Sequence, residues 1–475
     1  MEEEKTDRNK NMKIWKQWKR FFRGTVLGIG LVLWCSGCKA GSTGSQNHEE
    51  PKKVQEEMIE SVLPRKYDAR DHGKVSPVKD QGTLGTCWAF ASLQALESSL
   101  RPEEAFDFSE DHMSHNPHFF LEQEMGGDYI MSMAYLLSWQ GPVLESEDPY
   151  GDGISPDNLT ASKHVQEIHL LPSRDWEKIK QAVYTGGGVQ SAIYTALGRS
   201  NMESGYYNRE TNSYYYPEET APNHDVVIVG WDDDYPAENF LMDVPGNGAF
   251  LCENSWGQEF GKNGFFYVSY YDKNLGKTNI QYVKTEAADN YDKIYQSDLC
   301  GWVGQAGYGQ DTVWAVNVYE AGDRKEFLEA AGFYAIDRDT EYEVYLVRNV
   351  PESPGEKAFS ERKKLAEGYL ADAGYYTISF EKPQLLLPGE RFGVMIKITT
   401  PGAVHPIAVE YDTEDGKSQI DLLDGEGYIS PDGEQWEQTE KTQNCNLCLK
   451  AYTKLGGQSF YERIQAVLKQ RKTGK

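Results

Sequence analysis

The stretch Gln81-Gly-Thr-Leu-Gly-Thr-Cys87-Trp-Ala-Phe-Ala-Ser-Leu93 decides the fold of this chain. A polar loop with two glycines gives way at Cys87 to a mostly apolar run, which predicts a buried helix that begins at the cysteine. A thiol at a helix N-terminus lies close to unpaired backbone N–H groups, which favour the thiolate. Cys87 is therefore a candidate nucleophile, although a small buried core residue is the default interpretation of a free cysteine.

Gln81 precedes Cys87 in the same loop, where the chain can fold the side-chain amide of Gln81 back toward the sulfur. That amide and the backbone N–H of Cys87 would then form an oxyanion hole with two donors.

A candidate base stands in the segment Asn223-His224-Asp225-Val-Val-Ile-Val-Gly-Trp231, where a histidine opens a β-branched run that predicts a buried strand. A second apolar run leads to Asn254-Ser-Trp256-Gly. We expect Asn254 to accept the Nδ1–H of His224 and Trp256 to shield that bond from water. Taken alone, His224 is equally well a strand-end residue and Asn254 a turn residue, but chance does not readily place Gln, Cys, His and Asn in this order.

These residues resemble the papain-like cysteine peptidases, whose nucleophile lies in C-G-[SA]-C-[WY] with His and Asn far downstream. The resemblance covers roughly residues 63–285. Further matches include the segment from Leu63 to Arg70, Val75 to Lys79, Phe108-Ser-Glu-Asp111, Gly126-Gly127 and Trp256 to Gly264. Three positions depart from the family pattern, namely Leu84 in place of a disulfide cysteine, Thr86 before the nucleophile and Asp225 after the histidine. Because none of them removes a catalytic atom, an active site is expected.

The resemblance implies peptide-bond hydrolysis by a thiolate–imidazolium pair. Cys87 would attack the scissile carbonyl, Gln81 and the Cys87 N–H would hold the oxyanion, and His224 would protonate the leaving amine while Asn254 fixes its ring. No metal or organic cofactor is implied. The substrate-binding residues expected from the resemblance are Gly126, Gly127, Asp128, Tyr129, Ala192, Asp225 and Trp256.

Two of these residues, Asp128 and Asp225, are expected near the pocket for the second residue before the cut. Their carboxylates suggest that this pocket tolerates a basic side chain.

Composition excludes several classes of protein. A chain of 475 residues suggests two or three domains, and 39% hydrophobic residues suffice for real cores. The net charge of −26 argues against nucleic acid as a partner, because a phosphate backbone would be repelled. Seven cysteines in a chain of this length do not make a disulfide scaffold.

Residues 1–38 have the basic and apolar regions of a secretory signal and end in Cys35-Ser-Gly-Cys38. We expect a bacterial lipoprotein signal with Cys38 as the acylated residue, and the alternative is an uncleaved membrane anchor. In either arrangement the rest of the chain lies outside the cytoplasm, tethered to the membrane or secreted. Residues 39–62 are polar and predict a linker.

The character of the chain changes near residue 289. Short alternating runs separated by Gly, Pro and Asp turns predict an all-β sandwich over residues 289–455. This region resembles, more loosely, the lectin-like sandwich of some bacterial surface papain-like enzymes, which makes a cell-wall or surface carbohydrate a candidate partner. Cys300 and Cys445 could pair, whereas Cys445 and Cys448 on one strand would face opposite ways and do not suggest zinc. Residues 456–475 predict a helical tail.

The expected fold is therefore an α+β papain-like peptidase domain over residues 63–288, with a helical half and a β-barrel-like half, followed by the sandwich. The expected function is that of an extracytoplasmic cysteine endopeptidase acting on protein or peptide substrates. Two alternatives remain, a cell-wall amidase with the same Cys–His chemistry and an adhesin that binds carbohydrate on an inactive peptidase scaffold. The amidase is disfavoured because such enzymes lack the Gln81 loop and the Asn-Ser-Trp-Gly segment.

Overall fold

A computed structural model describes residues 63–456 except 116–117, 120, 157, 199–202, 356, 415–416 and 424–425. The expected signal with Cys38, the linker and most of the C-terminal tail lie outside the described residues. Within the described part of the chain, no helix is long and apolar enough to cross a membrane.

The first half of the peptidase region is helical, as expected. Its central helix α2 (Cys87–Leu100) is buried from Trp88 to Ser98, because apolar and small residues cover its whole circumference. Helix α2 packs against α3 (Glu110–Ser114), α4 (Tyr129–Leu137) and strand β6 (His224–Asp232). The remaining helical elements are η1 (Ala69–His72), η2 (Gln123–Met125), α5 (Trp176–Gly186) and η3 (Ala237–Asn239).

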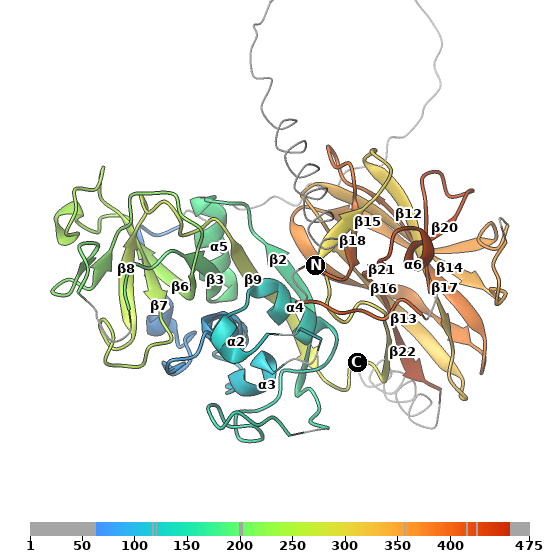
Figure 1. Ribbon diagram of the computed structural model, residues 1–475, viewed down its shortest axis with the longest axis horizontal. Helices are drawn as coiled ribbons and strands as arrows, with labels where there is room; N and C mark the ends of the chain where they lie inside the picture. The colour runs from blue at the N-terminus through green and yellow to red at the C-terminus, as the bar shows by residue number, and fades with distance from the viewer. Residues whose placement is uncertain are drawn as a thin grey trace, which may run out of the picture. The chain divides into compact units, whose positions relative to one another are not determined.

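The second half is built from strands around β6, whose run Val226–Val229 is fully buried. Figure 1 shows this half in green, with the blue and cyan helices α2 and α3 beside it. The strand order is β2-β9-β3-β6-β7-β8-β5-β4, and β1 pairs with β6. The strand bounds are β1 (Lys66–Asp68), β2 (Lys163–Leu170), β3 (Val189–Ile193), β4 (Tyr207–Asn208), β5 (Ser213–Tyr214), β7 (Ala249–Glu253), β8 (Phe265–Ser269) and β9 (Asn279–Ala287).

The rest of the described chain is the expected sandwich of β-strands. One of its sheets has the order β15-β14-β17-β12-β19-β20, and facing strands run in the order β10-β22-β13-β16. A short third sheet, β11-β18-β21, and helix α6 (Thr439–Thr442) complete this region. The bounds are β10 (Lys293–Tyr295), β11 (Gly304–Ala306), β12 (Thr312–Glu320), β13 (Glu326–Ala335), β14 (Thr340–Arg348), β15 (Arg362–Leu370), β16 (Ala373–Leu386), β17 (Arg391–Thr399), β18 (Ile407–Glu410), β19 (Gly427–Ser430), β20 (Glu437–Gln438), β21 (Asn446–Leu447) and β22 (Leu449–Leu455).

The two regions share one continuous sheet, which the sequence did not indicate. Strand β16 of the sandwich pairs antiparallel with β2 of the peptidase region, with Gly374 opposite His169. Gly374 has φ +147°, and a Cβ there would lie 2.0 Å from the carbonyl oxygen of Ile168. Glycine therefore permits the close approach of the two strands at this point.

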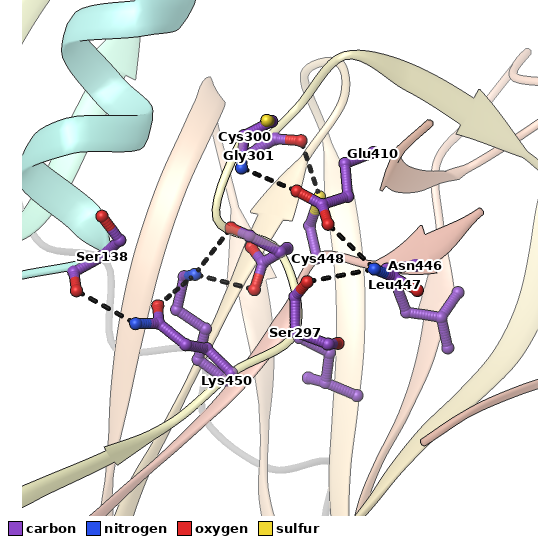
Figure 2. Close-up of polar contacts among 12 residues, drawn as sticks. Ser138, Ser297, Cys300, Gly301, Glu410, Asn446, Leu447, Cys448 and Lys450 are labelled. Atoms are coloured by element: carbon purple, nitrogen blue, oxygen red, sulfur yellow. Dashed lines mark hydrogen bonds and ion pairs between the residues drawn. The ribbon is translucent and has the colours of Figure 1, made fainter. Parts of the chain in front are cut away.

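A buried polar cluster also joins the two regions, as Figure 2 shows. The Nζ of Lys450 donates to Asp298 Oδ1 at 2.7 Å and to Gln296 Oε1 at 2.8 Å. The Nε2 of Gln296 in turn donates at 3.0 Å to the carbonyl oxygen of Ser138, at the end of α4. We refer to Lys450, Asp298, Gln296 and Ser138 as the Lys450 cluster.

The described cysteines are all free thiols, so Cys300 and Cys445 do not pair. Cys445 instead packs in the core of the sandwich, and two other thiols make hydrogen bonds. The Sγ of Cys300 donates to the carbonyl oxygen of His118, and the Sγ of Cys448 donates to that of Gly301 (Figure 2).

Candidate active site

The N-terminus of α2 places Cys87 at the edge of the core. Thr86 precedes the helix, and its carbonyl accepts from the N–H groups of Ala89 and Phe90 at 3.0 and 3.2 Å. The Thr86 side chain makes no capping bond, and its Oγ1 instead shares a 2.6 Å hydrogen bond with the hydroxyl of Tyr150. Cys87 is half-buried and lines a cleft, whereas Trp88 behind it is buried.

The loop before the helix holds Gln81 against the Asn254–Gly257 segment. The backbone N–H of Gln81 donates to the carbonyl of Ser255 at 2.9 Å, and its Oε1 accepts from Ser255 Oγ at 2.7 Å. The Nε2 of Gln81 donates to the carbonyl of Leu84 at 2.8 Å, which uses one of its two N–H bonds. The amide is thus fixed at both ends, and Gln81 lines the same cleft as Cys87.

His224 opens β6, and Asn254 follows the end of β7, its neighbour in the sheet. The Nε2 of His224 lies 2.7 Å from Asn254 Oδ1, which also accepts from the N–H of Ser255 at 2.9 Å. This geometry corrects the expected bond through Nδ1, because the ring is turned the other way. The Nδ1 atom is left available for the thiol. The ring of Trp256 lies over this pair, with its centroid 4.9 Å from that of His224.

Burial opposes charge on either reactive group. It raises the pKa of the Cys87 thiol to about 12, and the nearby Asp225 carboxylate adds to the rise. The backbone N–H groups of Asp225, Trp88 and Cys87 act in the opposite sense, the last two at the helix N-terminus as expected, but they do not outweigh burial. Burial likewise lowers the pKa of His224 to about 4. Burial therefore disfavours an isolated thiolate at Cys87 and an isolated imidazolium at His224.

The cleft that contains these residues has a volume of about 650 Å³. All of the expected substrate-binding residues line it, namely Gly126, Gly127, Asp128, Tyr129, Ala192, Asp225 and Trp256, together with Gln81, Cys87 and His224. Asn254 is buried behind His224.

The glycine pair lies close to the nucleophile loop. A Cβ on Gly85 would lie 2.8 Å from the backbone nitrogen of Gly126, and a Cβ on Gly127 would lie 2.5 Å from the Trp88 ring. The N–H of Gly85 also donates to the carbonyl of Gln123 at 2.9 Å. Side chains at Gly85 or Gly127 would therefore push this wall of the cleft outward.

The two carboxylates of the cleft have different partners. Asp128 accepts from the N–H of Ile130 at 2.9 Å and caps helix α4. Asp225 accepts from Gln190 Nε2 at 2.9 Å, and burial, with a smaller contribution from the Asp128 charge, raises the pKa of Asp225 to about 6.

Part of the cleft wall was not indicated by the sequence. The residues concerned are Glu124, Met125, Thr195, Leu197, Pro222, Asn223, Thr278 and Ile280. Most belong to loops without a motif, and only Asn223 lay in a segment already singled out. The role of Ser255 in orienting Gln81 was also missed, although Ser255 lies within the Asn-Ser-Trp-Gly segment.

The fold and the arrangement of the cleft residues agree with the families that the sequence matches. Residues 63–286 match the family described as papain family cysteine protease, and residues 294–453 match the family described as lectin like domain. The chain thus combines a papain-family cysteine peptidase domain with a lectin-like domain.

Among solved structures, the chain is similar to the clostridial cysteine protease Cwp84 after propeptide cleavage, with 27% identity and a TM-score of 0.74. The match covers 82% of this chain and 99% of that one. A second structure contains the cysteine protease and lectin-like domains of Cwp84, a surface layer associated protein of Clostridium difficile. It is 28% identical, has a TM-score of 0.72, and covers 83% of this chain and 89% of that one.

Two curated relatives each match less than half of the chain. The viral cathepsin of Heliothis zea nuclear polyhedrosis virus is 32% identical over 43% of this chain and 52% of its own length. Falcipain-3 of Plasmodium falciparum is 26% identical over 45% of this chain and 42% of its own length. The chain thus spans about half the length of the curated relatives it matches.

Proposed function

We propose that the chain is an extracytoplasmic cysteine endopeptidase in which Cys87, His224, Asn254 and Gln81 carry the chemistry. The observation that supports this most is the 2.7 Å bond between His224 Nε2 and Asn254 Oδ1, in a cleft that also contains Cys87 and Gln81. This bond holds the ring and leaves Nδ1 as the atom that takes the thiol proton.

In the proposed reaction the Cys87 proton moves to His224 as the sulfur attacks the scissile carbonyl. Because burial disfavours either charge alone, the thiolate and imidazolium form together and stabilise each other. The backbone N–H of Cys87 and the second N–H of Gln81 Nε2 donate to the oxyanion. The imidazolium then protonates the leaving amine, and the neutral imidazole activates the water that releases the acid.

The substrate would lie extended along Gly126 and Gly127, whose backbone groups can pair with it. The pocket near Asp128, Tyr129, Ala192 and Asp225 would receive the second residue before the cut. We propose that it accepts a basic side chain, which Asp225 attracts when ionised.

Labelling with an epoxide-type cysteine peptidase inactivator tests this proposal. We expect stoichiometric modification of the wild type at Cys87, located by peptide mapping, and loss of labelling in His224→Ala. The other described cysteines are buried and serve as internal controls. An unlabelled, folded wild type would contradict the proposal and favour the adhesin alternative.

We also propose an extracytoplasmic location with attachment through Cys38. Support comes from the basic and apolar N-terminal pattern and from the similarity to Cwp84, which is described as surface layer associated. Metabolic labelling with a palmitate analogue tests the attachment, because Cys38→Ser would lose the label if Cys38 is acylated.

A second function, carbohydrate binding, is supported by a groove of about 290 Å³ on strands β14, β15 and β17. Tyr369 is 57% exposed there, and Gly368 lies directly opposite Tyr342, which leaves room for the Tyr342 ring. Glu341 and Glu367 add carboxylates to the rim. Aromatic faces pack against sugar rings while carboxylates accept hydroxyl protons, so we propose that a surface glycan binds here.

A glycan array probed with the full chain tests this groove. Binding that disappears in Tyr369→Ala but persists in Tyr271→Ala, another exposed tyrosine, would support it. If Tyr369→Ala and Tyr271→Ala bind the glycan equally well, the glycan binds at another surface and not in this groove.

A further inference from the structure

Three aspartates gather on the helical half of the peptidase region, outside the cleft. Asp111 lies on α3, whereas Asp148 and Asp152 lie in the loop that precedes β2. One carboxylate oxygen from each of the three lies within 4.8 Å of the others. Asp111 is 0% exposed and Asp148 is 1% exposed, whereas Asp152 is exposed to solvent.

The two buried carboxylates are only half satisfied. Gln123 Nε2 donates to Asp111 Oδ1 at 2.8 Å, and Ser155 Oγ donates to Asp148 Oδ2. The other oxygens, Asp111 Oδ2 and Asp148 Oδ1, are buried and have no hydrogen-bond partner among the described residues. Neutral donors orient a carboxylate without balancing its charge, and an unbalanced buried charge is costly.

Neighbouring cations do not supply the balance. No ion pair joins Asp111, Asp148 or Asp152 to a basic side chain in the described part of the chain. Lys79, on the same side of the domain, is already held by Glu97 at 2.9 Å and by Asp107 and Glu110 at 2.8 Å. The surroundings of the three aspartates thus carry an excess of negative charge.

We propose that Asp111, Asp148 and Asp152 bind a divalent cation, and that this cation is calcium. The donor set consists of carboxylate oxygens alone, which suits a hard cation rather than zinc or copper. Ligands about 2.4 Å from a calcium ion lie at most about 4.8 Å apart, so one ion can reach an oxygen of each of the three aspartates. The exposed side at Asp152 leaves room for the water ligands that complete the coordination.

The proposed site has a direct connection to the cleft through Tyr150, which stands between two of its ligands in the chain. The Tyr150 hydroxyl donates to the carbonyl of Gln81 at 2.8 Å and shares its bond with Thr86 Oγ1. The Tyr150 ring packs edge-on against Phe90 of α2, with centroids 4.8 Å apart. A cation that orders the Asp148–Asp152 loop therefore supports the loop that holds Gln81 and the start of α2.

Calorimetric titration of the chelator-treated full chain with calcium chloride tests the site without reference to peptidase activity. We expect one saturable site with a dissociation constant of about 10⁻⁴ to 10⁻³ M, the range of extracellular calcium-binding modules, and a raised melting temperature. Asp152→Asn, a change at an exposed position, should weaken binding at least about tenfold. Asp243→Asn, also exposed but on the other half of the domain, should bind like wild type.

A buried pair of carboxyl groups that shares a proton is the main alternative, and Asp148→Asn distinguishes it. If calcium balances the charge, this variant should no longer respond to calcium and should melt above the chelated wild type, because the repulsion is removed. A wild type without saturable binding at about 10 mM calcium, or an Asp152→Asn variant with unchanged affinity, would overturn the proposal.

Discussion

The cleft and the Lys450 cluster both contain buried polar side chains, but they differ in how many of their hydrogen-bond donors already have partners. In the Lys450 cluster the ammonium is 1% exposed, and its three acceptors are Asp298 Oδ1, Gln296 Oε1 and the Asp298 carbonyl. In the cleft, Cys87 is half-buried, and one N–H of Gln81 remains for a ligand. An ammonium whose N–H groups all have acceptors fixes a structure, whereas a reactive site keeps its working atoms available.

The charge states of the ionisable groups also differ between the Lys450 cluster and the cleft. Lys450 and Asp298 form an ion pair at 2.7 Å that joins strand β22 to the segment after β10. Cys87 and His224 are both held toward their neutral forms by burial. We infer that the Lys450 cluster contributes to stability and the cleft to reactivity, and this separation can be tested.

The largest expected effect is on turnover, from Cys87→Ser. A serine hydroxyl beside the same imidazole is a much weaker nucleophile here, so hydrolysis should fall at least about 10³-fold. The urea unfolding midpoint should stay unchanged, because Cys87 is not part of the buried core. Hydrolysis of a fluorogenic peptide at saturating concentration measures the first quantity. Turnover near the wild-type level would show that Cys87 is not the nucleophile.

The next largest effect should be on stability, from Lys450→Met. Removing the ammonium leaves Asp298 buried without its partner, which costs about 3–5 kcal/mol of unfolding free energy. Urea titration measures this loss, and inactivator labelling of the folded fraction should remain stoichiometric.

The matched control removes both charges. Lys450→Met combined with Asp298→Asn should recover more than half of the lost stability, because no unpaired charge remains. A double variant as unstable as the single one would mean that packing of the lysine stem, and not its charge, matters.

Gln81→Ala should affect the cleft alone. Loss of one oxyanion donor lowers kcat by about 10²-fold to 10³-fold with little change in KM. Gln81→Glu keeps the shape but replaces the Nε2 donor, so it should show the same loss. A variant that raises KM while kcat is preserved would indicate a role in substrate binding instead.

Much of this site could be predicted from sequence because its chemistry needs particular residue types. Cys87 at a helix start, His224 at a strand start and Asn254 at a strand end were each indicated by local patterns. The orientation of the His224 ring could not be predicted, since it depends on a side-chain rotamer. The size of the burial effect on the Cys87 thiol could not be predicted either, since burial is a property of the folded chain and here outweighs the helix terminus.

Other features depend on contacts between distant segments. The pairing of β16 with β2 leaves no local pattern, because any exposed strand edge can accept a partner. Asp111 and Asp148 look like ordinary surface residues until the fold buries them side by side. The type of each element was therefore predictable, whereas long-range neighbours and their electrostatic consequences were not.

The smallest expected effect concerns the pH dependence of specificity at Asp225. Burial raises the pKa of Asp225 to about 6, so the carboxyl is mostly neutral below that pH and ionised above it. A substrate with arginine at the second position before the cut should be cleaved with a higher kcat/KM only when Asp225 is ionised. The ratio of kcat/KM for an arginine substrate to that for a leucine substrate should therefore rise up to about fivefold between about pH 5 and pH 7.

Asp225→Asn removes this ionisation and should flatten the ratio, while Asp128→Asn should leave most of the rise in place, since Asp128 caps α4. The pH profile of each substrate must be measured on both variants, because protonation of His224 alters both rates equally and cancels in the ratio. A ratio that stays constant in the wild type would show that Asp225 does not contact the substrate. In that event the pocket would select by shape, and Cys87 and His224 alone would carry the charges on which the chemistry of the cleft depends.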